Sequence, residues 1–379
     1  MALQAVGGKN IMKSSFYTLV NILAYKADYN IIFGERSNGK TTAVLEYALK
    51  EHVNSNYKYQ LGLIRRWEED FKGTKSTDMV SGIISLGWVS KYTKERYNTI
   101  IYRAMNWYLA NIQEDGTKEV AEQPFIKGFA ISSQEHYKST AYPDIKMILF
   151  DEFITRDYYL PDEFIKFQNL LSTIIRLRDD VVIFMCGNTV NKYCPYFKEM
   201  GLNNITKQKQ GTIDIYQYGN STLKVAVEYS TMGNKKIKKS NKYFAFDNPK
   251  LQMITNGTWE IDIYPHLPIK YTPNEVKYTY FIIWEDTTLQ CEIIRSKALA
   301  AYFTYIHLKT TPIKEDNKNI VYQCEPSAKP NYRRNITITD DKITNLIYNF
   351  YKNDKVFYQS NDIGELIRNY MMWCRTSTL

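Results

Sequence analysis

The segment from Asn30 to Lys50, NIIFGERSNGKTTAVLEYALK, constrains the fold more than any other part of this sequence. Its first residues form an apolar run that ends at a glycine, which is typical of a buried parallel strand. Its last residues place apolar side chains at helical spacing among good helix formers. A glycine-containing turn between a strand and a helix predicts an α/β fold in which the turn can hold a nucleotide phosphate.

The turn contains the complete G-x-x-x-x-G-K-[ST] pattern, with Gly34, Gly39, Lys40 and Thr41 at the fixed positions. The two glycines permit a tight wrap in which backbone N–H groups point at phosphate oxygens, near the positive end of the following helix. We expect Lys40 to reach the outer phosphates, Thr41 to supply a hydroxyl to Mg²⁺, and Thr42 to bond the inner phosphate. A chance match is the alternative, and the strand and helix on either side argue against it.

Two acids follow a second apolar strand, in the segment IKMILFDEF at residues 145–153. Asp151 and Glu152 stand at its carboxyl end, where ligands lie in open α/β sheets. We expect Asp151 to hold the Mg²⁺ shell and Glu152 to orient and deprotonate an attacking water. A nucleoside kinase needs no such water, so the adjacent glutamate favours a hydrolase. An acidic surface turn is the alternative, and it would be the better interpretation of an isolated Asp-Glu pair.

A third apolar run, VVIFMCGNTVN, places Asn188 just past its end. This side chain could sense the terminal phosphate or position the water, or it could cap the next turn together with Thr189. Before this strand, a predicted helix over residues 164–174 ends near Arg176 and Arg178. Such arginines usually compensate a helix dipole. The alternative is an arginine finger, Arg176 or Arg178, that reaches a neighbouring subunit's nucleotide.

Length and composition limit the class of protein. A chain of 379 residues is too long for one comfortable core, so two domains are expected. Its apolar runs fall far short of the roughly 20 residues of a membrane span, and the first residues lack the pattern of an export signal. The five scattered cysteines and four dispersed histidines predict reduced thiols in a cytosolic protein, and no metal beyond Mg²⁺.

The formal net charge of +9 predicts a polyanionic partner, with nucleic acid first, although biased coding DNA can also produce a composition rich in lysine. A dense basic run, GNKKIKKSNKYF at residues 233–244, could hold DNA phosphates without reading sequence, or it could be a solvated linker. The segment KPNYRRN at residues 329–335 could contact nucleic acid or could be a plain loop.

The composition changes after about residue 228, shortly before the basic run begins. We predict a domain at residues 1–228, a basic connector at 229–258 and a second domain at 259–379.

These motifs together resemble the DNA-packaging ATPases of small protein-primed podophages of the phi-29 type. The resemblance rests on GERSNGKTT, AYPDIKMILFDEF, the arginines before the third strand and NTVNKYCPYF, and it extends over about residues 14–200. It implies an additional-strand (ASCE) P-loop ATPase with a central, mostly parallel sheet, in which Lys40 and Thr41 bind Mg-ATP, Asp151 and Glu152 serve the metal and the water, and Arg176 acts in trans.

The same resemblance adds Arg36, Ser37 and Asn38 to the nucleotide-binding loop. Ser37 departs from the family, which usually has glycine at that position, and its side chain restricts the loop. Lys138 matches a basic residue that acts across the subunit boundary, with a solvated lysine as the alternative.

The resemblance also implies an α+β ribonuclease-H-like domain in the second half. Two predicted strands over residues 277–296, joined at 285–288, and a closing amphipathic helix at 363–374 are compatible with it. Nucleases of this fold use clustered acids to bind two metals. The acids Glu285, Asp286, Glu292 and Glu365 show no such arrangement in the sequence, so no DNA cleavage is expected.

The implied function is ATP-driven translocation of double-stranded DNA into a viral procapsid. The motor would be a homomeric ring, of five subunits by analogy, that docks on the portal in the cytoplasm of the bacterial host. The sequence leaves open whether a packaging RNA takes part. The alternatives are another ring ATPase that acts on nucleic acid, such as a helicase, and a non-catalytic nucleic-acid-binding structural protein.

Overall fold

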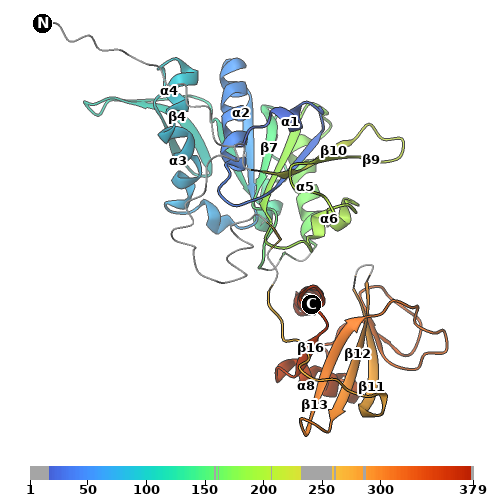
Figure 1. Ribbon diagram of the computed structural model, residues 1–379. Coiled ribbons are helices and arrows are strands. Elements are labelled where there is room, and N and C mark those ends of the chain that lie inside the picture. Colours follow the sequence, from blue (N-terminus) through green and yellow to red (C-terminus); the bar gives the residue numbers. More distant parts are fainter. Residues whose placement is uncertain are drawn as a thin grey trace, which may run out of the picture. The chain divides into compact units, whose positions relative to one another are not determined.

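The computed structural model describes residues 17–157, 159–160, 162–205, 207–231, 258–259, 262–284 and 287–376. The chain divides into two compact units, residues 1–259 and 260–379 (Figure 1). The basic run at residues 233–244 and the acids Glu285 and Asp286 lie outside the described residues. The limits of the predicted connector therefore stay a prediction. Within the described ranges, no helix combines the length and the apolar character that a membrane crossing requires.

The first unit contains a ten-stranded sheet in the order β3-β4-β6-β2-β7-β8-β1-β10-β9, with β5 paired to β4. Six neighbouring strands run parallel: β6 (Ile126–Ala130), β2 (Gln60–Arg65), β7 (Ile145–Asp151), β8 (Val182–Asn188), β1 (Tyr29–Gly34) and β10 (Lys224–Ser230). The antiparallel strands lie at the edges: β3 (Thr99–Arg103), β4 (Asn106–Ile112), β5 (Lys118–Val120) and β9 (Ile213–Gln217).

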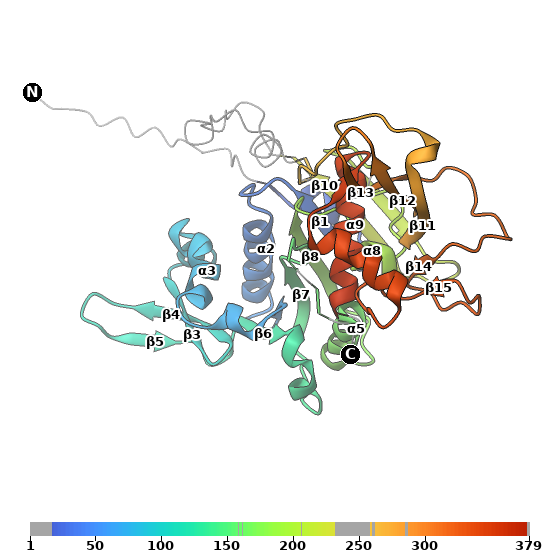
Figure 2. The same cartoon turned by 90° about the horizontal axis from the view of Figure 1, so that it is seen from below.

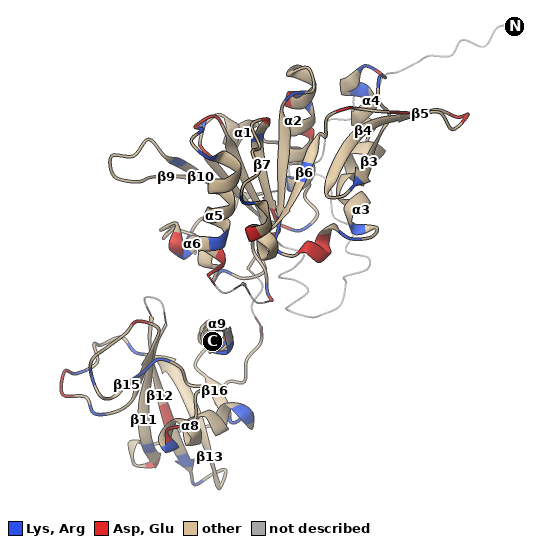
Figure 3. Cartoon of the chain, turned by 180° about the vertical axis from the view of Figure 1, so that it is seen from behind, with Lys and Arg blue, Asp and Glu red and all other residues tan. Residues whose placement is uncertain are grey.

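The order of the central strands confirms the predicted additional-strand P-loop fold. Strand β1 leads into the glycine-containing turn, and β7 ends at Asp151 with Glu152 directly after it. Strand β8 lies between β1 and β7 and pairs with both. Charged residues of the parallel strands lie mainly at or near the strand ends, as the tan central strands in Figure 3 show. This pattern is expected for parallel strands that are buried on both faces.

Helices cover both faces of this sheet. One face packs against α1 (Val20–Leu23), α2 (Lys40–Asn54), η1 (Glu68–Phe71), α3 (Lys75–Ser85) and α4 (Trp88–Thr93). The other packs against η2 (Ile131–Tyr137), α5 (Glu163–Ile175) and α6 (Pro195–Glu199). Figure 2 shows α2 and α5 on opposite sides of the central strands. Successive residues of β7 point to opposite faces of the sheet, so Leu149 packs in the hydrophobic core with α2 and Phe150 packs in the core with α5.

The second unit is a six-stranded sheet in the order β15-β14-β11-β12-β13-β16. Its strands are β11 (Val276–Trp284), β12 (Thr287–Ser296), β13 (Ala301–Leu308), β14 (Val321–Gln323), β15 (Tyr332–Arg333) and β16 (Val356–Tyr358). The first three form an antiparallel meander, and β14 and β15 continue parallel to β11 on its other side. This is the strand order of ribonuclease-H-like folds, and β16 extends it beyond β13.

Two predicted elements of the second unit are present. The hairpin is formed by β11 and β12, and the closing helix is α9 (Asn361–Thr376), preceded by α8 (Lys342–Lys352). Two of the four acids considered from the sequence, Glu292 and Glu365, are described, and both are hydrogen-bonded to tyrosines. Glu292 accepts a hydrogen bond from Tyr271, and Glu365 accepts one from Tyr264. The described part of the chain holds no group of three or more His, Cys, Asp or Glu residues that could bind a metal.

The segment KPNYRRN forms part of this unit's surface around β15. Arg333 lies 3.7 Å from the Asp341 carboxylate, and Arg334 stacks over the Trp373 ring at 5.6 Å. Lys329 lies 6.0 Å from the centre of the Tyr332 ring. These contacts show that the three cations also have partners within the unit. A role in binding nucleic acid stays a prediction.

Replacing Gly187 in β8 by alanine is expected to lower the free energy of unfolding by about 1–3 kcal/mol, because extra atoms in a filled core displace their neighbours. The added Cβ would lie 2.8 Å from Ile154 Cγ1 and 3.0 Å from Phe153 Cε1. Urea denaturation of the purified variant measures this change.

Gly82→Ala is the matched control, because an added Cβ within α3 meets only Thr42 side-chain atoms at 3.8 Å and 3.9 Å. Alanine favours a helix over glycine, so this variant should be more stable by up to about 1 kcal/mol. If Gly187→Ala unfolds at the same urea concentration as the unaltered protein, the packing around the end of β8 is not as described.

Candidate nucleotide-binding site

The turn after β1 depends on backbone conformations that glycine adopts easily. Gly34 has φ of 150°, and a Cβ at this position would lie 2.5 Å from Ser230 Oγ and 2.6 Å from the Ser230 carbonyl oxygen. Gly39 has φ of 90° and is the N-cap residue directly before α2. Ser37 also has a positive φ, of 58°. A residue other than glycine in this conformation costs of order 1 kcal/mol.

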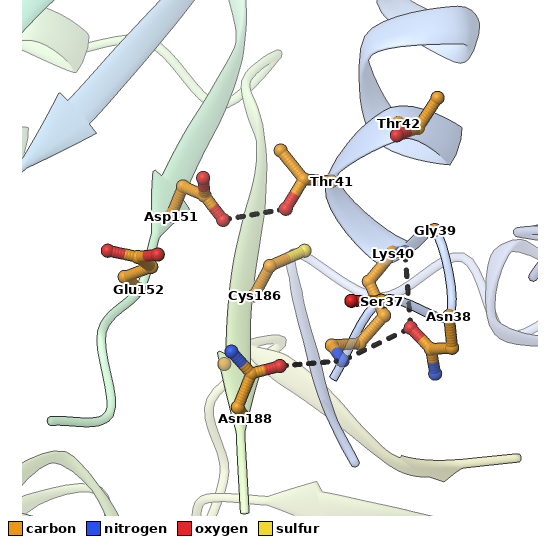
Figure 4. Close-up of a pocket in the computed structure, with 11 residues that line it drawn as sticks. Ser37, Asn38, Gly39, Lys40, Thr41, Thr42, Asp151, Glu152, Cys186 and Asn188 are labelled. Carbon is orange, nitrogen blue, oxygen red and sulfur yellow. Dashed lines mark hydrogen bonds between the residues drawn. The ribbon is translucent and has the colours of Figure 1, made fainter. Parts of the chain in front are cut away.

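Lys40 is held in place by oxygens around the turn. Its ammonium donates to the Glu35 carbonyl at 2.6 Å. It also donates to Asn38 Oδ1 at 3.1 Å and to Asn188 Oδ1 at 3.2 Å (Figure 4). The residue is 5% exposed. These three partners are neutral oxygens, and they orient the ammonium.

The phosphate loop is also held by β10 and by the chain before β1. The Asn38 amide donates to Ser230 Oγ at 3.0 Å, and the Ser230 hydroxyl donates to the Phe33 carbonyl at 3.0 Å. The Tyr17 backbone N–H donates to the Asn38 carbonyl at 3.0 Å. These bonds tie the loop to β10 and to the chain before β1, so its N–H groups are held in a fixed arrangement.

The two acids lie opposite the beginning of α2. The Thr41 hydroxyl donates to Asp151 Oδ1 at 2.7 Å, which joins the phosphate loop to the acidic strand. Arg65, at the end of β2, lies 2.9 Å from Asp151 Oδ2 and 2.6 Å from Glu152 Oε2. Burial raises the pKa of Asp151, and the Arg65 charge and the Thr41 hydrogen bond oppose that rise.

One pocket collects most of the residues that the sequence predicted. Its lining consists of Ser37, Asn38, Gly39, Lys40, Thr41, Thr42, Asp151, Glu152, Cys186, Gly187 and Asn188. Two of the predicted residues, Gly34 and Arg36, are outside this lining. Gly34 shapes the turn, and Arg36 is exposed. The Asn188 side chain faces Lys40, which favours the phosphate-sensing interpretation over capping of the next turn. A hydroxyl and a carboxylate 2.7 Å apart are hard oxygen ligands that suit Mg²⁺.

Two functional candidates were missed from the sequence, Arg65 and Arg66. Both follow the apolar run of β2, in the segment LGLIRRW. Their signal was a pair of cations at the carboxyl end of a predicted parallel strand, which is the edge where the acids of β7 also lie. Their partners are carboxylates between 86 and 97 positions away, and no local spacing indicates such pairs.

The two arginines after α5 have different surroundings. Arg178 bonds five backbone carbonyls, those of Tyr142, Pro143, Ile145, Ile174 and Ile175. Arg176 is exposed and donates to the Thr140 carbonyl at 2.9 Å. Arg178 therefore joins the loop after α5 to the segment before β7, whereas Arg176 lies exposed on the surface of that loop. Lys138 is exposed and pairs with Glu135.

Three comparisons relate this chain to known proteins. Residues 120–240 match the family described as podovirus DNA encapsidation protein (Gp16). The DNA packaging protein of Bacillus phage phi29 is 27% identical over 195 residues, which cover 49% of this chain and 50% of the relative. The DNA packaging protein of Bacillus phage B103 is 27% identical over 186 residues, which cover 48% and 50%. The match thus spans about half the length of these curated relatives.

Solved structures extend the likeness to nearly the whole chain. The Phi-28 gp11 DNA packaging motor has a TM-score of 0.53 at 16% identity and covers 96% of this chain and 98% of that one. The bacteriophage Phi-29 viral genome packaging motor assembly has a TM-score of 0.50 at 18% identity and covers 94% and 97%. At these identities the likeness shows a shared fold. The resemblance to phi-29-type packaging proteins that the motifs predicted is confirmed.

Arg178→Ala is expected to lower the free energy of unfolding by about 3 kcal/mol, because it leaves several carbonyls without their charged donor. Arg176→Ala should change it by less than about 0.5 kcal/mol, since that side chain is exposed. Chemical denaturation of both variants measures the difference. Equal losses in the two variants would contradict the division of roles between these arginines.

Proposed function

We propose that this protein is an ATPase that drives double-stranded DNA into a phage procapsid as a homomeric ring on the portal. The observation that carries the proposal is the contact between the phosphate loop and the acidic strand, with Thr41 bonded to Asp151 at 2.7 Å. The relatives are named as DNA packaging proteins and the solved neighbours as packaging motors, which supports the biological role.

The site residues divide the work on ATP. The N–H groups of the loop and the Lys40 ammonium would bind the phosphates, and Thr41 and Asp151 would hold Mg²⁺. The metal would neutralise charge that develops on the phosphate oxygens. Glu152 would accept the proton of the attacking water, for which it must turn from Arg65, now 2.6 Å away. Asn188, bonded to Lys40, would contact the terminal phosphate.

Arg176 would complete the site of a neighbouring subunit. Its exposure and the rigid loop that Arg178 fixes support this role, because a trans-acting arginine must reach beyond its own chain. A site that needs its neighbour explains why the motor would be a ring. We infer five subunits by analogy, with double-stranded DNA and the portal as partners, a packaging RNA as a further candidate, and the bacterial cytoplasm as the place of work.

DNA would be gripped through its phosphates. The net charge of +9 suits a polyanion, and phosphate contacts are indifferent to base sequence and sensitive to salt. A helicase would share the ATPase site, so unwinding of a forked duplex separates it from a translocase. A non-catalytic nucleic-acid-binding protein is disfavoured, because a phosphate loop, both acids and Asn188 line one pocket.

Glu152→Gln and Arg176→Ala are each expected to lower phosphate release at least 100-fold while Mg-ATP still binds with Kd within about threefold of the unaltered protein. The first removes a general base and the second a charge that acts on the transition state. Phosphate release is measured with double-stranded DNA present, and binding by titration of a non-hydrolysable ATP analogue.

Arg103→Ala is the control, because Arg103 is an exposed residue of the edge strand β3. It should hydrolyse ATP at the unaltered rate. Full phosphate release by Glu152→Gln would return the non-catalytic interpretation to first place.

A further inference from the structure

We propose that Arg66 is a positioning residue for hydrolysis, which holds the backbone of the general base Glu152 in its working conformation. The inference rests on the proposed ATPase function. Arg66 does not line the nucleotide pocket. Its guanidinium instead bonds the backbone of Glu152 and Phe153, the two residues that follow β7. The residue follows β2 and is 6% exposed.

The guanidinium of Arg66 bonds three groups at once. Its Nε donates to Glu163 Oε2 at 2.8 Å, its Nη2 to the Phe153 carbonyl at 2.9 Å, and its Nη1 to the Glu152 carbonyl at 3.4 Å. The two carbonyls belong to the first two residues after β7. Arg66 thus links the end of β2 to the turn that carries the general base.

Glu163 fixes Arg66 from the other side. It is the first residue of α5, and its side chain is 1% exposed. Besides Arg66, its carboxylate accepts a bond from the Tyr196 hydroxyl at 2.7 Å and from the Leu160 N–H at 2.7 Å. The Arg66 guanidinium also lies over the Tyr159 ring at 5.0 Å. The ion pair is therefore enclosed, and its geometry is set by several fixed neighbours.

The turn needs such support because Glu152 has a left-handed backbone, with φ of 58°. This conformation is costly for a residue other than glycine, and it persists only where the surroundings determine it. The surroundings are the two bonds from Arg66 and the bond from the Phe153 N–H to the Cys186 carbonyl at 3.3 Å. They hold the backbone from which Glu152, whose side chain is 65% exposed, lines the pocket.

Stability alone does not account for this ion pair. A buried pair contributes little net stability, because desolvation offsets the attraction, and apolar residues of similar volume can replace it. The planar fork of arginine bonds a carboxylate and two carbonyls in one fixed plane, whereas the ammonium of lysine is a compact point charge on a flexible stem. The chemistry of Arg66 is therefore matched to holding the turn in one orientation.

The test compares kcat and KM for ATP in Arg66→Lys, in the triple variant Arg66→Met with Glu163→Leu and Tyr196→Phe, and in the control Arg103→Lys. Lysine keeps the charge beside Glu163 but loses the fork. The triple variant replaces the buried charges by apolar groups, and because it leaves the Leu160 N–H and two carbonyls unpaired it should be less stable to urea but still folded at the assay temperature. We expect both to lose at least tenfold in kcat with KM within twofold, and the control to lose nothing.

The outcomes separate this inference from the proposed function. Absence of hydrolysis by the unaltered protein removes the proposed function and this inference with it. Normal kcat in either folded Arg66 variant, while the unaltered protein hydrolyses ATP, overturns the positioning role alone. A fall in kcat that comes with a matching loss of stability and a raised KM in both variants also overturns it, because Arg66 would then be structural only.

Discussion

The hydrogen bond between Thr41 and Asp151 is the contact on which the rest of the structure depends. It joins the helix after the phosphate loop to a strand that is not the loop's own neighbour, because β8 lies between β1 and β7. The register of β8 sets the geometry, with Asn188 beside Gly34 and Cys186 beside Asp151. A single strand therefore places Asn188 next to the loop and the acids at the same edge of the sheet.

Three residues of the proposed site have strained backbone conformations. Ser37, Glu152 and Arg176 have φ of 58°, 58° and 54°, in the left-handed region that favours glycine. Each such residue costs of order 1 kcal/mol or more, and all three belong to the site or to its proposed reach into a neighbour. Arginines support two of the three, since Arg66 holds the turn of Glu152 and Arg178 holds the loop of Arg176.

The sequence predicted the parts of the fold whose signals are local. Strands β1, β7 and β8 are long apolar runs, and the glycine pattern and the acids stand directly at their ends. Spacing could not separate Arg176 from Arg178, because their difference lies in bonds to carbonyls more than 30 residues away. The roles of Arg65 and Arg66 were hidden for the same reason. In the second unit, β14 and β15 have three and two residues, which is too short for a periodic pattern.

The most direct measurement of the central claim is calorimetric titration of the unaltered protein with ATP, with and without Mg²⁺. The loop and the acids form one triphosphate pocket in this account, so one ATP per chain should bind, and Mg²⁺ should tighten that binding at least tenfold through Thr41 and Asp151. Absence of saturable binding of Mg-ATP, or binding that Mg²⁺ does not change, would contradict the account.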